Sequence, residues 1–153
     1  QHGILLVFPA DIAANAADAF LRKLFQKNLT STFQVIRTAF ASVSDLCIVG
    51  DSLYYVGTAW DNATMSNTIS YGIINTKTHK QVATSIFSSQ DIKNIEMPYG
   101  IMVNPEGRDF YITDAKNYTS SGKLYHFSAE GSLLWEQWTS DIPSKMLFYK
   151  VEK

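Results

Sequence analysis

Two stretches of the sequence resemble one another, and the segments that follow them form a second similar pair. Gly50-Asp51-Ser52-Leu53-Tyr54-Tyr55-Val56 corresponds to Gly107-Arg108-Asp109-Phe110-Tyr111-Ile112-Thr113, and Ile69-Ser70-Tyr71-Gly72-Ile73 corresponds to Lys123-Leu124-Tyr125-His126-Phe127. Each copy holds four short segments within roughly 45–55 residues, the size of one β-propeller blade. A β-sandwich would have similarly spaced strands without an internal copy, so the repetition favours a propeller.

The segments are rich in aromatic and β-branched residues and are separated by Gly, Asn, Asp, Pro and Ser, the pattern of antiparallel strands and turns. Three turns, at Val49–Ser52, Asn104–Gly107 and Ala129–Ser132, contain a glycine that can adopt a positive φ. We predict strands at Phe33–Phe40, Asp45–Val49, Ser52–Thr58, Thr68–Asn75, Gln81–Phe87, Gly100–Val103, Asp109–Thr113, Lys123–Ser128, Leu133–Thr139 and Met146–Val151.

The first forty residues have a different pattern. Gly3–Phe8 is a short apolar run that we interpret as a strand, and Asp11–Lys27 carries apolar residues at helical spacing behind a capping aspartate. We therefore expect an N-terminal strand and helix in residues 1–40 and a β-blade domain in residues 41–153. The predicted fold is mostly β: a partial propeller with two full four-stranded blades, at about 45–92 and 98–140, and part of a third.

Composition excludes several function classes. The 153 residues include 13 basic and 14 acidic side chains, so the net charge of −1 provides no field for binding nucleic acid. No apolar run approaches the ~20 residues that cross a bilayer, so we expect no transmembrane segment. The single cysteine, Cys47, and the scattered histidines lack metal-ligand spacing, and no nucleotide-binding or nucleophile motif is present, so we expect no metal and no cofactor.

The segment Pro98–Ala115 carries a more specific signal. Its order is a proline and glycine start, a turn at Asn104-Pro105-Glu106-Gly107, and the strand Phe110-Tyr111-Ile112-Thr113-Asp114. This order resembles the repeat of bacterial YVTN-type and NHL-like surface propellers. With the continuation to Trp135, it is similar to the propeller domain of surface lipoproteins from Bacteroides-type gut bacteria. The resemblance covers about Asp45–Tyr149 and implies an extracytoplasmic binding or scaffold protein at the cell surface or in the periplasm.

Blade geometry predicts where a binding site would lie. Alternate connections of a meander fall at the same end, so the longer connections Ala59–Asn67, Ser88–Pro98, Asp114–Gly122 and Ser140–Lys145 should share one end. Binding residues tend to lie in such loops on a rigid scaffold. The predicted ligand, a glycan or a partner protein, would contact Trp60, Asp61, Asn62, Asp114, Asn117 and Tyr118.

Other aromatic residues occupy strand positions, and we expect them to pack between blades. They are Tyr54, Tyr55, Tyr71, Phe110, Tyr111, Tyr125, Phe127, Trp135 and Trp138. The string Ser128–Trp135 is similar to the tryptophan-docking turn of quinoprotein propellers, which also occurs in propellers that bind no quinone.

The preferred interpretation is a non-catalytic binding module with no catalytic residues. One alternative is a structural half-propeller that self-assembles, because an open blade edge invites a homodimer. A hydrolase or a quinone-dependent oxidoreductase is a weaker alternative. About six blades would need roughly 240–270 residues, so the chain is too short for a complete ring of that size.

Overall fold

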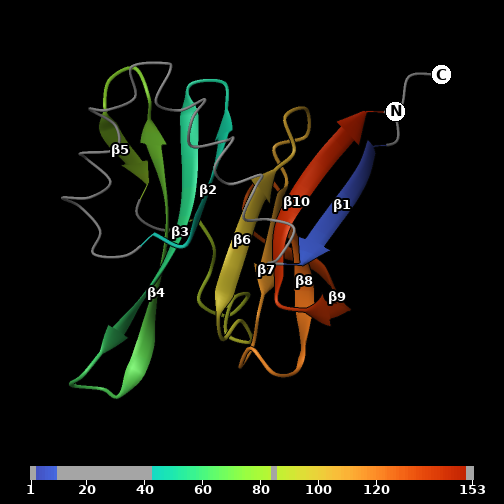
Figure 1. Ribbon diagram of the computed structural model, residues 1–153. Coiled ribbons are helices and arrows are strands. Elements are labelled where there is room, and N and C mark those ends of the chain that lie inside the picture. The colour runs from blue at the N-terminus through green and yellow to red at the C-terminus, as the bar shows by residue number, and fades with distance from the viewer. Residues whose placement is uncertain (1–2, 10–42, 84–85, 151–153) are drawn as a thin grey trace.

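The computed structural model describes residues 3–9, 43–83 and 86–150. The described residues form ten β-strands, so the prediction of a mostly β fold is confirmed (Figure 1). The predicted helix at Asp11–Lys27 and the predicted strand at Phe33–Phe40 lie outside the described residues. The predicted N-terminal strand is confirmed as β1 (Gly3–Pro9).

Two four-stranded antiparallel meanders make up most of the structure. The first sheet contains β2 (Asp45–Val49), β3 (Ser52–Asp61), β4 (Ser66–Asn75) and β5 (Lys80–Ala83) in that order. The second contains β6 (Pro98–Val103), β7 (Phe110–Asp114), β8 (Ser121–Phe127) and β9 (Leu133–Asp141). In a third, two-stranded sheet, β10 (Pro143–Lys150) pairs with β1, which joins residues from opposite ends of the sequence.

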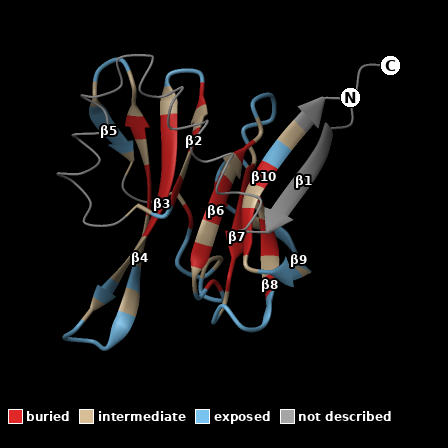
Figure 2. Ribbon diagram, in the orientation of Figure 1, coloured by how far each residue is buried: buried red, intermediate tan, exposed pale blue. Residues whose placement is uncertain are grey.

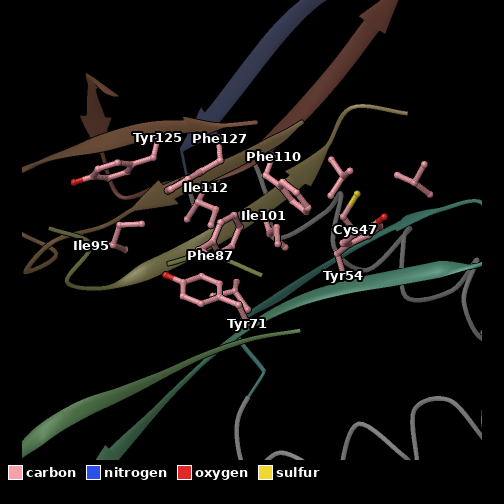
Figure 3. Close-up of a cluster of buried hydrophobic side chains, with 13 residues drawn as sticks. Cys47, Tyr54, Tyr71, Phe87, Ile95, Ile101, Phe110, Ile112, Tyr125 and Phe127 are labelled. Atoms are coloured by element: carbon pink, nitrogen blue, oxygen red, sulfur yellow. The ribbon is translucent and has the colours of Figure 1, made fainter. Parts of the chain in front are cut away.

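The main core lies between the two large sheets. Side chains alternate between sheet faces, so Tyr54 and Val56 point from β3 toward the second sheet while Leu53 and Tyr55 point to the opposite face. Phe87 lies in the middle of this core, with its ring centroid 5.0 Å from that of Tyr71 and 4.6 Å from that of Phe127 (Figure 3). The core therefore depends on aromatic contacts that join both sheets.

One strand from each of the three sheets lies next to a strand of another, with β2 against β6 and β6 against β10. A buried carboxylate links them: Asp45 on β2 accepts a hydrogen bond from the Ile101 backbone N–H on β6, at 3.0 Å, and forms an ion pair with Lys145 on β10. Burial raises the pKa of Asp45 above its usual 3.8, although Lys145 opposes this shift. One acidic side chain thus connects all three sheets.

Several strand boundaries differ from the prediction. The β3–β4 ladder continues in regular register to Asp61↔Ser66, so Trp60 and Asp61 lie in a strand and the connection is only Asn62–Met65. The expected long connection at Ser140–Lys145 is reduced to Ile142 between β9 and β10. Backbone hydrogen bonding extends these strands through polar residues that the sequence pattern places in turns.

The β6–β7 turn and the tryptophans of β9 also differ from the prediction. Gly50 and Gly131 have positive φ as predicted, but in the β6–β7 turn the positive φ belongs to Arg108 and not to Gly107. Trp135 and Trp138 were expected in the core, yet they are 42% and 64% exposed on β9. Figure 2 shows this outer strand mostly in the colour of exposed residues, because no further strand covers it among the described residues.

Candidate functional site

The β3–β4 and β7–β8 turns lie at the same end of the two sheets, drawn lower in Figure 1 and called the lower end below. The β2–β3 and β6–β7 turns lie at the opposite end. The six predicted site residues therefore share one end, in two groups: Trp60, Asp61 and Asn62 on the first sheet, and Asp114, Asn117 and Tyr118 on the second.

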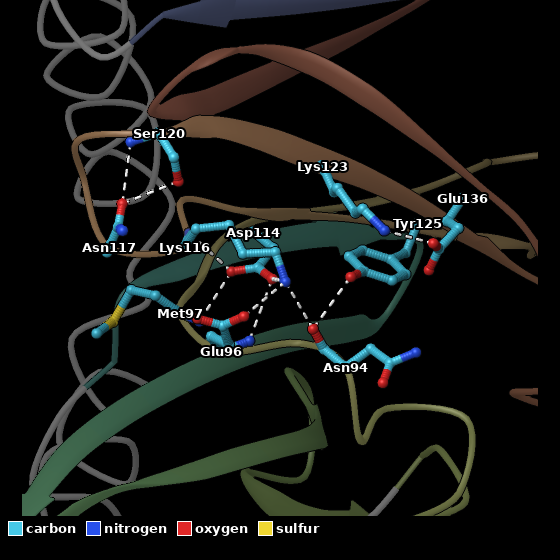
Figure 4. A network of polar contacts seen from close by, with 10 residues as sticks. All are labelled: Asn94, Glu96, Met97, Asp114, Lys116, Asn117, Ser120, Lys123, Tyr125 and Glu136. Atoms are coloured by element: carbon cyan, nitrogen blue, oxygen red, sulfur yellow. Dashed lines mark hydrogen bonds and ion pairs between the residues drawn. The ribbon is translucent and has the colours of Figure 1, made fainter.

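Asp114, the last residue of β7, is completely buried and fully engaged (Figure 4). Its carboxylate accepts hydrogen bonds from the backbone N–H groups of Glu96, Met97 and Lys116, at 3.1, 2.8 and 2.9 Å. The Lys116 ammonium lies 2.9 Å from Oδ2. The carboxylate therefore holds the β5–β6 connection against the β7–β8 turn, and its oxygens are not available to a ligand.

Lys116 completes the polar cluster around the buried Asp114. Its Nζ donates to the Asn94 carbonyl at 2.8 Å and to Glu96 Oε1 at 3.1 Å, and Tyr125 Oη donates to the same Asn94 carbonyl. Burial acts to lower the pKa of Lys116, but the hydrogen bonds from its ammonium to Asp114 and Glu96 outweigh that effect and raise it. The lysine stays charged and fixes the shape of the lower end of the second sheet.

Asn117 has a similar structural role in the turn itself. Its Oδ1 accepts hydrogen bonds from the backbone N–H and the hydroxyl of both Thr119 and Ser120, at 2.9–3.1 Å. An asparagine oxygen that binds the chain two and three residues ahead forms an Asx-type turn. This turn positions Tyr118, which has a φ of 64°.

Tyr118 is the accessible member of the second group. Its side chain is 43% exposed, and its ring packs edge-to-face against Tyr99 with centroids 5.8 Å apart. Burial, and to a lesser extent the neighbouring Tyr99, raise the pKa of Tyr118, so its hydroxyl stays protonated at neutral pH. The pair offers a supported aromatic surface with a hydroxyl at its edge.

The first group is more open. Trp60 is 56% exposed near the end of β3, and Met65 in the adjoining turn is 71% exposed. Asp61 Oδ1 accepts the Ala63 N–H at 2.8 Å, and this bond, with the Thr64 hydroxyl, lowers the pKa of Asp61. Asn62 is exposed at the start of the turn. The aromatic ring of Trp60, the thioether of Met65 and the amide of Asn62 are therefore exposed at this end of the first sheet.

A second polar cluster, which the sequence did not suggest, lies on the face of the second sheet that points away from the main core. His126 Nε2 is 2.8 Å from Asp109 Oδ2, and the His126 ring stacks on Tyr111 with centroids 4.3 Å apart. Burial acts to raise the pKa of Asp109, but hydrogen bonds from His126 and Tyr111 hold it below the usual 3.8. No sequence spacing signals this pair, because strand pairing across β7 and β8 creates it.

The described residues contain no group of three or more His, Cys, Asp or Glu side chains that could hold a metal ion. Within the same residues, no helix has the length and apolar character needed to cross a membrane. In comparisons with known proteins, no family model matches the sequence, and no curated protein matches it significantly.

Proposed function

We propose that the chain is a partial β-propeller that acts as an extracytoplasmic, non-catalytic binding module. The order of the sheets supports this fold: β2, β6 and β10 lie side by side, as the innermost strands of consecutive blades would. The corresponding residues Tyr54 and Tyr111 each face the next sheet, Tyr54 packing on Phe110 and Tyr111 packing near Phe148 of β10. The location follows from the resemblance to surface lipoproteins.

The proposed ligand is a glycan or a partner protein that binds at the lower end. One observation carries this proposal: Trp60 and Tyr118, 56% and 43% exposed, stand at the same end of two rigid sheets. Exposed aromatic rings on a rigid scaffold provide stacking area at low entropic cost. Asp61 and Asn62 would add polar contacts beside Trp60, whereas Asp114 and Asn117 would act only by positioning the turn that carries Tyr118.

Binding to a glycan array, followed by titration of any glycan that binds, tests the proposal. The double variant Trp60→Ala/Tyr118→Ala should lose at least about tenfold in affinity, equivalent to about 1.4 kcal/mol. Val82→Ala, which trims a 64% exposed apolar side chain on β5, is the control and should bind as the wild type does. Unchanged binding by the double variant would remove the site assignment, and equal losses in both would mean nonspecific adhesion.

A further inference from the structure

The outer strand β9 leaves one edge of the second sheet without a partner strand in the part of the chain that the structure describes. Three large apolar side chains on it are exposed: Leu134 at 55%, Trp135 at 42% and Trp138 at 64%. An unpaired edge presents free backbone N–H and C=O groups to another strand. Exposed tryptophans beside such an edge indicate an interaction surface, because burying them against another chain is energetically favourable.

The outer strand of the first sheet is protected differently. As described, β5 has four residues, begins with Lys80, and has a register shift in its pairing with β4. Short length, lysine and bulges are the features that protect edges from association. In β9, register shifts occur near both ends, but the ladder is regular from Trp135 to Trp138, and no lysine, arginine or proline occurs in the strand.

The charges around β9 make it complementary to itself. Lys123 on β8 forms an ion pair with Glu136, at 2.5 Å, and lies over the Trp138 ring, 4.6 Å from its centroid. If two copies of β9 pair antiparallel with Gln137 on the two-fold axis, Glu136 of each copy lies opposite Trp138 of the other. Residues directly opposite are about 5 Å apart, so each Glu136 also approaches the second copy's Lys123.

Neighbouring registers lack this match. With Glu136 on the axis, two carboxylates would lie directly opposite, and with Trp138 on the axis the two Lys123 ammonium groups would be brought together. Like charges directly opposite destabilise antiparallel pairs. In the Gln137-centred register, Trp135 lies opposite the neutral Thr139 on the other face of the sheet. The arrangement of charges thus favours the register centred on Gln137.

From these features we infer that the chain forms a two-fold symmetric homodimer through antiparallel pairing of β9 with β9, with Gln137 at the axis. The interface is isologous, so the β9 edge of each copy is covered by the β9 edge of the other. This assembly does not depend on the proposed ligand site, because Trp60 lies on β3 and Tyr118 lies in the β7–β8 turn.

Light scattering on the full chain, from about 1 to about 100 μM protein, tests the dimer, since a small interface dissociates in this range. The wild type should have twice the 17.2 kDa monomer mass at the upper concentrations. Gln137→Lys places two ammonium groups at the axis and should give a monomer. Gln90→Lys makes the same change at an exposed position in the β5–β6 connection and should remain dimeric.

Cross-linking tests the register independently. Cys47, the only native cysteine, is buried, so an introduced surface thiol can be oxidised selectively. Gln137→Cys should form a disulfide-linked dimer under mild oxidation, whereas Thr139→Cys should not, because its two copies would be more than about 7 Å apart. Any one of three results would overturn the inference: a monomeric wild type at 100 μM, a dimer that survives Gln137→Lys, or equal cross-linking at both positions. Circular dichroism confirms that each variant is folded.

Discussion

Replacing Asp114 should destabilise the fold more than any other single change at the lower end. The carboxylate is completely buried, accepts three backbone hydrogen bonds and pairs with the Lys116 ammonium. Removing one partner of a buried ion pair costs about 3–5 kcal/mol, because the other charge is left without compensation. The Lys116 side chain is 12% exposed and keeps Glu96 as a partner, so water and Glu96 offset part of this loss.

We therefore expect Asp114→Ala to lower the free energy of unfolding by about 3 kcal/mol. Asp114→Asn should cost about half as much, since its amide oxygen still accepts from one side of the site. For a domain of this size each kcal/mol lowers Tm by about 2–4 °C, so the alanine variant should melt roughly 10 °C below the wild type. Urea denaturation followed by circular dichroism measures both variants.

The controls separate the ion pair from the backbone hydrogen bonds. Lys116→Met removes the ammonium, and the double variant with Asp114→Ala should be less destabilised than the two single changes predict, because the two groups are in contact. Asp61→Ala removes an exposed carboxylate at the end of β3 and should change stability little. A loss below about 1 kcal/mol for Asp114→Ala would refute the structural role assigned to this carboxylate.

Three further changes test the core, the second polar cluster and a turn. Phe87→Ala should cost about 3–5 kcal/mol in urea unfolding, because it removes a buried ring that touches both sheets. Asp109→Asn should lower the free energy of unfolding at pH 7, and the loss should shrink below about pH 4. The reason is that the lowered pKa of Asp109 contributes stability that is present above 3.8 and is lost as the pH falls through the pKa of the folded state. Urea midpoints at pH 7 and pH 3, with His126 intact, measure this difference. Gly131→Ala should lower the stability of the fold by about 2 kcal/mol or more, and by more than Gly50→Ala does. Both glycines have a positive φ, but only at Gly131 would the new Cβ lie 2.1 Å from a backbone carbonyl oxygen. Thermal melts compare the two variants.

The strands could be predicted because local chemistry specifies them. Each segment is rich in β-branched and aromatic residues, and turn residues separate the segments, so all eight strands of the two large sheets were expected near their observed positions. Their ends were less predictable. Trp60 and Asp61 extend β3 because β4 supplies hydrogen-bond partners across the sheet, and a polar segment gives no local sign of such a partner.

Burial of aromatic residues was predictable only on inner strands. Tyr54 and Trp138 are both aromatic residues in strands, yet Tyr54 is buried between sheets and Trp138 is on the outermost strand. Alternation identifies the two faces of a strand but does not show which face another sheet covers. The predicted packing of Trp135 and Trp138 was wrong because strand order in the sheet decides it.

The location of the candidate site could be predicted from the sequence, but which of its polar groups are free to bind a ligand could not. Asp114 was expected among ligand-contacting residues, but backbone N–H groups at Glu96 and Met97 occupy its oxygens, and nothing in the sequence identifies those donors. The Asp45–Lys145 pair joins residues 100 positions apart, beyond the reach of any local pattern. Short-range turn bonds, such as those of Asn117, are the polar contacts that sequence reasoning can anticipate.

Among the described residues, the exposed aromatic side chains fall in two places, the lower end and β9, and the two proposals can therefore be tested against each other. If ligand binding and dimerisation use separate surfaces, Trp60→Ala/Tyr118→Ala should leave the dimer intact, and Gln137→Lys should leave ligand affinity per chain intact. A dimer with two lower ends could still bind a multivalent glycan more tightly through avidity. Gln137→Lys would then weaken binding to an immobilised array but not to the same glycan free in solution, and a loss in both assays would mean that β9 contributes to the ligand site.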